Sequence, residues 1–327
     1  MRGGLMPSGG TVAVLDVGCF SAHLVVVRDG ALLDPLVSHK VRLRLDRAVD
    51  FSGRVSRDGV ARIASAVRES QRLVRRSGVD TFLPFVTSVV RDATNADAVV
   101  AAVEARTGVE LRRMSGRREA ELSYLAARRW FGWSAGPLTV LDVGGGTVEI
   151  AVGDGAAPAF AHSLPLGART LTREWERGGK PARDGLRAFG DTLARRIREA
   201  MPPDAVDRAR TGRAVGCSKL FQQLARLAGA RPQRDGPLVP RRLAAADLAG
   251  WVPRLAELPA ADRARLPGIS RHRAGQAVAG AVVARALMVA TGHDVVDICP
   301  WSTKEGLLIT LSEQPPRCAE GDACAVA

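Results

Sequence analysis

The feature that most constrains the fold is a short pattern that occurs twice along the chain: an apolar strand, an acidic residue and a glycine turn. The first copy, residues 14–21, reads Val-Leu-Asp-Val-Gly-Cys-Phe-Ser, and the second, residues 140–147, reads Val-Leu-Asp-Val-Gly-Gly-Gly-Thr. Repetition of one such unit indicates two half-domains built on the same plan. Two turns of this kind that face each other would hold one phosphate group between them.

The second copy offers the clearer candidate site. Gly144, Gly145 and Gly146 expose backbone N–H groups with no Cβ atom in the way, which is the geometry of an anion nest. The nest is flanked by two acids and a hydroxyl: Asp142, Glu149 and Thr147. Carboxylates would repel a bound phosphate unless a divalent cation lay between them, so we expect the acids to hold a metal ion. Taken alone, the motif fits a structural glycine-rich hairpin equally well.

Size and composition indicate a two-core protein of the cell interior. The 327 residues are 46% hydrophobic, enough to bury two cores of ordinary domain size. No apolar run reaches the ~18 residues needed to span a bilayer, and residues 1–10 lack the features of a secretory signal. The five cysteines have no zinc-like or paired spacing, which is typical of a reducing compartment. We therefore expect a cytoplasmic protein without membrane contact.

The charge balance points to an anionic partner. The formal net charge is +13, and a basic surface favours nucleic acid, acidic lipid or polymeric phosphate. A bias of genome composition toward arginine and alanine explains any single arginine equally well. Aromatic residues make up only 4% and do not alternate with basic ones, so we expect no specific nucleic-acid partner.

Strand and helix signals alternate along the chain, which predicts an α/β architecture. In the first half we expect strands at 11–15, 23–28, 36–45, 82–87 and 109–112 and helices at 58–76, around 96–103 and up to residue 130. In the second half we expect strands at 138–141, 148–150, 159–163, 212–216 and 294–299 and helices near 168–175, 184–200, 218–227, 243–255, 274–290 and 304–311. The domains are placed at 11–133 and 134–312, and the tails 1–10 and 313–327 are expected to be disordered.

Further motifs follow the first glycine turn in one order. Residues 87–95 read Thr-Ser-Val-Val-Arg-Asp-Ala-Thr-Asn, residues 115–122 read Ser-Gly-Arg-Arg-Glu-Ala-Glu-Leu, and residues 304–307 read Lys-Glu-Gly-Leu. Together with the two turns, they resemble the exopolyphosphatase and guanosine pentaphosphate phosphatase family from about residue 12 to residue 308. The crossover at 128–136 is similar to that of the short, two-domain actinobacterial exopolyphosphatases.

The resemblance implies a fold, an activity and a set of site residues. The fold would be two ribonuclease-H-like domains, as in actin, heat-shock ATPases and sugar kinases, with a cleft between them and a homodimer as the assembly. The activity would be metal-dependent hydrolysis of the terminal phosphate of inorganic polyphosphate, preferably of short chains. By motif position, Glu119 would be the general base that deprotonates the attacking water. Phosphate would be bound by Gly18, Cys19, Ser21, Arg91, Gly144, Gly145, Gly146 and Thr147. Mg²⁺ or Mn²⁺ would be held by Asp16, Asp142 and Glu149.

The chain departs from the family pattern at three places. Cys19 and Phe20 stand where the family usually has serine and asparagine, so the first turn loses side-chain donors to phosphate. We expect Cys19→Ser with Phe20→Asn to raise turnover, provided that Phe20 does not pack the domain interface. Arg118 replaces the first acid of a glutamate pair and would lower the pKa of Glu119 if the two side chains are close. Lys304 replaces an arginine.

Other interpretations remain open on the sequence alone. The same scaffold could hydrolyse guanosine pentaphosphate or a nucleoside triphosphate. The loss of donors in the first turn could also indicate a catalytically weak regulator that binds polyphosphate or nucleotide. Ser218 and Lys219 could bind a second phosphate, or Ser218 could simply cap a helix. His23 is interpreted as structural, because the histidines form no metal-binding cluster.

Overall fold

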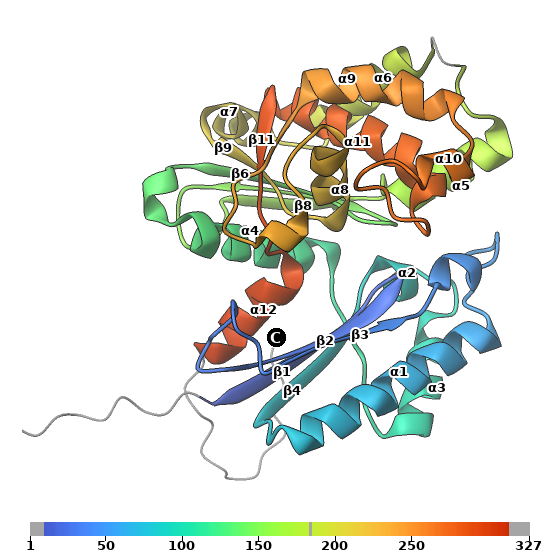
Figure 1. Ribbon diagram of the computed structural model, residues 1–327, viewed down its shortest axis with the longest axis vertical. Helices are drawn as coiled ribbons and strands as arrows, with labels where there is room; N and C mark the ends of the chain where they lie inside the picture. Colours follow the sequence, from blue (N-terminus) through green and yellow to red (C-terminus); the bar gives the residue numbers. More distant parts are fainter. Residues whose placement is uncertain (1–9, 183–184, 314–327) are drawn as a thin grey trace, which may run out of the picture.

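Two β-sheets with the same strand order form the frame of the molecule (Figure 1). The computed structural model describes residues 10–182 and 185–313. The first sheet has the order β3-β2-β1-β4-β5, and the second has the matching order β8-β7-β6-β9-β11 with β10 added at its edge. The predicted sequence repeat is therefore a structural repeat, and the expected α/β fold of two related halves is confirmed.

The elements follow the alternating order that the sequence predicts. The first half contains β1 Thr11–Val17, β2 Ser21–Arg28, β3 Val37–Arg42, α1 Arg57–Arg76, β4 Thr81–Val86, α2 Ser88–Arg91, α3 Ala96–Thr107, β5 Arg112–Arg113 and α4 Gly116–Phe131. The second half contains β6 Leu138–Val143, β7 Val148–Gly153, β8 Phe160–Leu164, α5 Ala168–Gly178, α6 Gly185–Glu199, α7 Pro203–Thr211, β9 Arg213–Gly216, α8 Lys219–Leu227, β10 Arg242–Ala244, α9 Ala245–Glu257, α10 Ala260–Arg263, α11 Ala277–Thr291, β11 Val295–Ile298 and α12 Thr303–Ser312. Short 3₁₀ turns are η1 Leu45–Arg47, η2 Trp133–Ala135, η3 Gln233–Asp235 and η4 Ala274–Gln276.

Strand direction is repeated as well as strand order. β1 is antiparallel to β2 and parallel to β4, while β6 is antiparallel to β7 and parallel to β9. Because side chains alternate along a strand, β1 buries Ala13 and Leu15 in one core and Val12 and Val14 in another. Both faces of each sheet are therefore covered, as the apolar runs predict.

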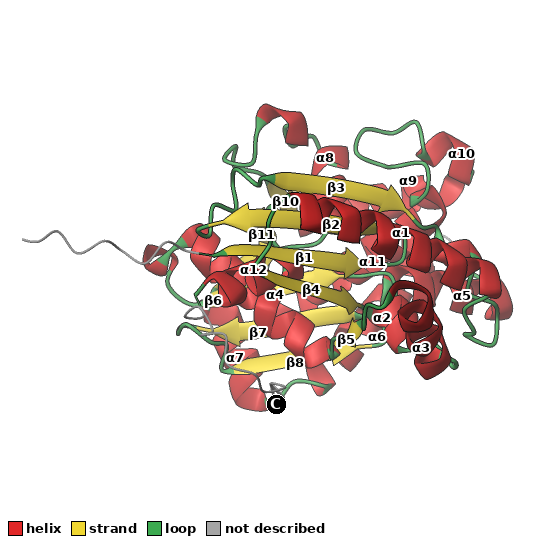
Figure 2. Ribbon diagram, turned by 90° about the horizontal axis from the view of Figure 1, so that it is seen from below, coloured by secondary structure: helices red, strands yellow, loops and turns green. Residues whose placement is uncertain are grey.

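Helices cover the sheets in layers that Figures 1 and 2 show from two sides. Residues of α1 and α3 share one core with the first sheet, while residues of α5, α6, α8, α9 and α11 share one with the second. Between the two sheets lie α4 and α12, which pack against each other. These two helices join the halves into one molecule.

The two middle helices each pack on the sheet of the opposite half. α4, from the first half, contacts β6, β7 and β8, and α12, near the end of the chain, contacts β1. The helices cross at Gly306, where an added Cβ would lie 2.0 Å from the carbonyl oxygen of Leu122. Next to this crossing, the hydroxyls of Ser123 and Thr303 hydrogen-bond at 3.0 Å. The domain limits 11–133 and 134–312 stay a prediction, and the packing links residues across them.

A few short elements were not predicted. They are α2, α7, α10 and β10, and β5 is a two-residue strand that begins at Arg112, where the predicted strand ends. α2, α10 and β10 have three or four residues, too few to show a periodicity in a sequence, whereas α7 has nine residues and was missed. Nearly all of the tails predicted to be disordered lies outside the described residues.

One helical segment, Ala274–Thr291, is long and apolar enough by composition to cross a membrane. Its position explains the composition, because 78% of the segment is buried inside the protein. α11 forms most of the segment and packs between α5, α6 and α9 in the core of the second half. A helix that is apolar all round is expected in such a central position.

Candidate active site

Four acidic side chains from both halves share one electrostatic environment. They are Asp16 on β1, Asp142 on β6, Glu149 on β7 and Glu119 in the first turn of α4. Asp142 and Glu149 are direct cross-strand partners. Burial is the main cause that raises the pKa of Glu119, and the charges of Glu149, Asp16 and Asp142 add to it. The repeat therefore brings the predicted metal and catalytic acids together.

The second glycine turn presents unused backbone donors. The Gly144 N–H closes the turn by donating to the Thr147 carbonyl at 2.9 Å. Within the described residues, no carbonyl or side chain accepts the N–H groups of Gly145, Gly146 or Thr147. Gly146 and Thr147 are buried, so bulk water competes little for their donors. Adjacent unpaired N–H groups of this kind form an anion-binding nest.

The first turn faces the second and keeps its backbone donors. A Cβ added at Gly145 would lie 3.8 Å from the Cβ of Cys19. The Gly18 N–H donates to the Ser21 carbonyl at 3.0 Å, which is the same closure as in the second turn. The N–H groups of Cys19 and Phe20 have no acceptor in the described part of the chain. The first turn therefore lacks the family's side-chain donors but still offers N–H groups.

Arg91 holds the carboxylate of Glu119 in place. Its Nη1 donates to Oε1 of Glu119 and, at 2.9 Å, to the Met114 carbonyl, while Nε and Nη2 donate to Asp92 at 2.7 and 3.0 Å. Burial raises the pKa of Glu119 well above its usual range although Arg91 lowers it. A carboxylate with a raised pKa is a stronger base once it has lost its proton.

Arg118 does not act on Glu119 as the sequence suggested. Its guanidinium pairs with Glu121 at 3.1 Å, and its side chain is half exposed. Arg118 pairs with Glu121 instead, and the arginine whose charge lowers the pKa of Glu119 is Arg91. Consecutive residues of a helix do not face each other, so adjacency in sequence does not bring the two side chains together.

Burial raises the pKa values of the three acids that were predicted to hold metal. The pKa of Asp16 is raised to about 6, and that of Asp142 is also raised to about 6 although Ser302 donates to its Oδ2 at 3.2 Å. The pKa of Glu149 is raised to about 8, first by burial and then by the charge of Asp142, against a 2.8 Å hydrogen bond from Ser163. These carboxylates have few partners that would stabilise their charged forms.

The acids fit magnesium in one coordination mode only. Among the described residues, no group of three or more His, Cys, Asp or Glu side chains could enclose a metal ion. Mg²⁺ usually keeps several waters and takes one or two carboxylates together with substrate phosphates. Asp142 and Glu149 suit that mode, and the buried Oδ1 of Asp16 has no hydrogen-bond partner and could accept from a metal-bound water.

Three cations that the sequence analysis did not assign to one site lie near the acids. They are Lys40, Lys219 and Arg273. Burial lowers the pKa of Lys40 on β3, and the charge of Arg273 lowers it further. Burial also lowers the pKa of Lys219, which starts α8, and Lys40 and Arg273 add to the shift. Cations that destabilise one another in this way favour a polyanionic ligand. Lys40 and Arg273 are far apart in sequence, so no local motif could have identified them.

Arg169 was also missed, although a sequence signal existed. Its N–H donates to the Gly145 carbonyl at 2.8 Å, and its Nη1 lies 3.8 Å from Sγ of Cys19. Gly167 packs against the glycine turn, because a Cβ there would lie 2.4 Å from the carbonyl carbon of Gly146. A glycine followed by a helix with an early arginine is a recognisable anion-site pattern.

Two smaller interpretations are resolved by the contacts. The Oγ of Ser218 accepts the Phe221 N–H at 3.3 Å, so Ser218 caps α8 as one alternative predicted. His23 bonds through Nε2 to the Ser38 hydroxyl at 3.0 Å on the neighbouring strand, which fits its structural interpretation.

Phe20 does pack between the halves. Its ring is buried and lies 5.1 Å from the ring of His272, which belongs to the second half. The condition attached to the Phe20→Asn substitution is therefore not met. Asparagine would replace a packed ring by an amide without a partner, which destabilises a buried site.

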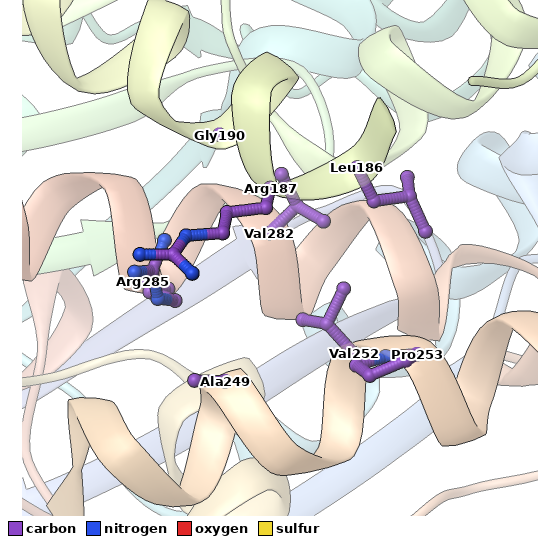
Figure 3. A pocket seen from close by; sticks show the side chains of 8 residues that line it. All are labelled: Leu186, Arg187, Gly190, Ala249, Val252, Pro253, Val282 and Arg285. Carbon is purple, nitrogen blue, oxygen red and sulfur yellow. The ribbon is translucent and has the colours of Figure 1, made fainter. Parts of the chain in front are cut away.

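A separate cavity of about 500 Å³ lies among α6, α9 and α11 (Figure 3). It is lined by Leu186, Arg187, Gly190, Ala249, Val252, Pro253, Val282 and Arg285. None of the predicted site residues belongs to this lining. The candidate active site is therefore defined by the facing turns and their acids.

The stability of the metal-free protein should depend on pH through Glu149. Its pKa is raised from 4.5 to about 8, so the folded state keeps a proton that the unfolded state loses at lower pH. Between about pH 5 and pH 8 the unfolded state binds fewer protons, and the free energy of unfolding falls as the pH rises. We expect the melting temperature in chelator to fall over this range and the slope to flatten in Glu149→Gln. An unchanged slope in that variant would contradict the assignment.

Comparison with known proteins identifies the family of the chain. Residues 24–314 match the Ppx/GppA phosphatase family. "Exopolyphosphatase 1" of Mycobacterium tuberculosis is 41% identical over 300 residues, which cover 91% of this chain and 87% of the relative. An uncharacterized protein of Streptomyces coelicolor is 45% identical over 307 residues, which cover 93% of this chain and 91% of that protein.

Solved structures share the fold. The crystal structure of an exopolyphosphatase from Cytophaga hutchinsonii superimposes with a TM-score of 0.77 at 19% identity and covers 93% of this chain and 98% of its own. An Aquifex aeolicus member of the Ppx/GppA family gives a TM-score of 0.75 at 22% identity, with 92% and 97% covered. On the family match and the sequence identity to its relatives, the chain belongs to the Ppx/GppA phosphatase family.

Proposed function

We propose that this protein is an exopolyphosphatase, which hydrolyses the terminal phosphoanhydride bond of inorganic polyphosphate with a divalent cation. The observation that carries the proposal is the pair of facing turns, whose unpaired N–H groups lie beside Asp16 and three buried acids, Glu119, Asp142 and Glu149. A phosphate held by these donors would lie within the same electrostatic environment as Glu119. The 41% identity to a protein named exopolyphosphatase supports the same reaction.

Different residues would bind the phosphate, accept the proton and hold the metal ion. The N–H groups of Gly145, Gly146 and Thr147 would bind the terminal phosphoryl group and stabilise the charge that develops on its oxygens. Glu119, oriented by Arg91, would take a proton from the attacking water. A bound Mg²⁺ or Mn²⁺ would neutralise phosphate charge, with oxygens of the Asp16, Asp142 and Glu149 set as its candidate ligands.

The cations favour a substrate with several phosphates in a row. Three of these cations are close enough for the charge of one to lower the pKa of another: Arg273 lowers that of Lys40, and both lower that of Lys219. A chain of phosphates that extends from the facing turns would neutralise them. Guanosine pentaphosphate has a run of only three phosphates, as tripolyphosphate does, and it also carries a base that needs a binding surface. We therefore place polyphosphate first and guanosine pentaphosphate second.

The test is phosphate release by the purified protein. We expect release from tripolyphosphate in the presence of Mg²⁺, and at least tenfold less after addition of chelator, because loss of a charge-neutralising ion costs on the order of several kcal/mol in the barrier. Long-chain polyphosphate and guanosine pentaphosphate are the comparison substrates, and we expect both to react more slowly. Full activity in chelator would remove the metal from the mechanism, and preference for guanosine pentaphosphate would reverse the substrate order.

We also propose a cytoplasmic location. Cys19, Cys217 and Cys299 are free thiols, which suits a reducing compartment. The homodimer implied by the family resemblance stays a prediction, which sedimentation of the purified protein would test.

A further inference from the structure

Phe20 is a residue for which the phosphate chemistry of the site gives no role. It stands at the tip of the first glycine turn, where the family pattern has a polar residue, and it donates nothing through its side chain. Its ring is nevertheless buried at the contact between the two halves. A large apolar ring at the centre of a polar site therefore requires an explanation.

The ring lies directly beside one of the cations of the site. The guanidinium carbon of Arg273 is 4.6 Å from the centroid of the Phe20 ring. Within residues 10–182 and 185–313, the Arg273 guanidinium has no hydrogen bond or ion pair. Burial lowers its pKa, although the charges of Cys19 and Asp142 act in the opposite direction. Among the described side chains, the aromatic face is thus the group in direct contact with this cation.

Arginines elsewhere in the site are held differently. Arg91 is fixed by hydrogen bonds to two carboxylates and a carbonyl, which leaves its position independent of a ligand. Arg273 keeps its N–H donors free, and a ring face can orient a guanidinium without using any of them. A cation held in this way is oriented for an anion and keeps its full capacity to bind it.

We propose that Phe20 is a positioning residue that holds the Arg273 guanidinium toward the substrate phosphates. The inference rests on the proposed polyphosphate substrate. Phe20 belongs to the first half and Arg273 to the second, so the contact also links the first turn to the opposite half. Cys19 and Phe20 lack the side-chain donors that the family usually has in the first turn. The arginine from the opposite half thereby compensates for their loss.

The test uses replacements of Phe20 that keep its size while they weaken its negative face. Mono-, di- and trifluorinated phenylalanine at position 20 should weaken the binding of tripolyphosphate stepwise, by about tenfold at the end of the series, which is the scale of one cation–π contact. Binding is measured by titration calorimetry in the Glu119→Gln background, and KM is measured in the otherwise unchanged protein. KM should rise along the series, while kcat and the melting temperature stay nearly constant.

Two further variants separate positioning from packing. Phe20→Leu keeps an apolar side chain without a ring and should weaken binding to the same extent, but it should have no further effect once Arg273→Gln is present. Phe131→Leu is the matched control, because Phe131 contacts Arg213 at 5.4 Å at the far end of α4 and should leave KM unchanged.

The affinity measurements test the positioning role of Phe20 separately from the proposed phosphate release. Constant affinity along the fluorinated series, or additive effects of Phe20→Leu and Arg273→Gln, would overturn the positioning role. If the wild-type protein releases no phosphate, the proposed function fails, but the affinity series for tripolyphosphate still tests the contact. If tripolyphosphate does not bind to the wild-type protein, both proposals are overturned.

Discussion

Replacement of Glu119 by glutamine should reduce phosphate release by roughly 10²–10⁴-fold, the contribution expected of a general base. Glutamine has nearly the same shape and can still accept a hydrogen bond from Arg91, but it cannot take a proton from water. The binding of tripolyphosphate should remain, because no phosphate ligand has been removed. Single-turnover rates and calorimetric affinities measured on the same preparation would show this separation.

Stability and a neighbouring glutamate provide the controls. Burial disfavours the charged form of Glu119, so glutamine should leave the melting temperature unchanged or raise it. Glu121→Gln changes the same residue type on the same helix, where the side chain pairs with Arg117 and Arg118. That variant should retain its turnover. Normal turnover in Glu119→Gln would remove this residue from the mechanism, and equal losses in both variants would indicate a general effect on α4.

The second large effect is expected at the crossing of the two middle helices. In Gly306→Ala, the new methyl group would lie 2.0 Å from the Leu122 carbonyl oxygen, a contact with backbone that no rotamer change relieves. The helices must move apart, and overpacking of this kind typically costs about 1–3 kcal/mol or more of the free energy of unfolding. Glu119 lies one turn before Leu122 on α4, so turnover should fall together with stability.

Urea unfolding and steady-state rates would check this prediction. Gly250→Ala is the matched control, because Gly250 is a helical glycine of α9 with no heavy atom within 4 Å of an added Cβ. There the same substitution should be neutral or should stabilise the fold by about 0.4–1 kcal/mol, because alanine lowers the conformational entropy of the unfolded chain. Equal stability of the two variants would show that the helices tolerate a wider separation at Gly306.

Much of the frame follows from local patterns that the chain carries. Each strand of the two hairpins alternates or is continuously apolar, and each glycine turn follows an acid at the same spacing, so the repeat predicts both sheets and the residues at their turns. The order of the motifs, through the family resemblance, also assigns Glu119 and Arg91 to one site, although it gives Arg91 to phosphate and says nothing of a contact between them. These conclusions depend only on patterns within short segments and on the repetition of one strand–acid–glycine unit.

The remainder depended on contacts between residues far apart in the chain. Whether Arg118 or Arg91 acts on Glu119 is decided by the direction of side chains on α4 and α2, which adjacency in sequence does not give. The ring of Phe20 has a partner in Arg273 only because the two halves fold against each other. Local sequence determined the two turns and their acids, since hairpin geometry and hydrophobic periodicity are properties of short segments. Only the tertiary structure decided how the charges pair, since burial and Coulomb interactions depend on distances that sequence spacing does not contain.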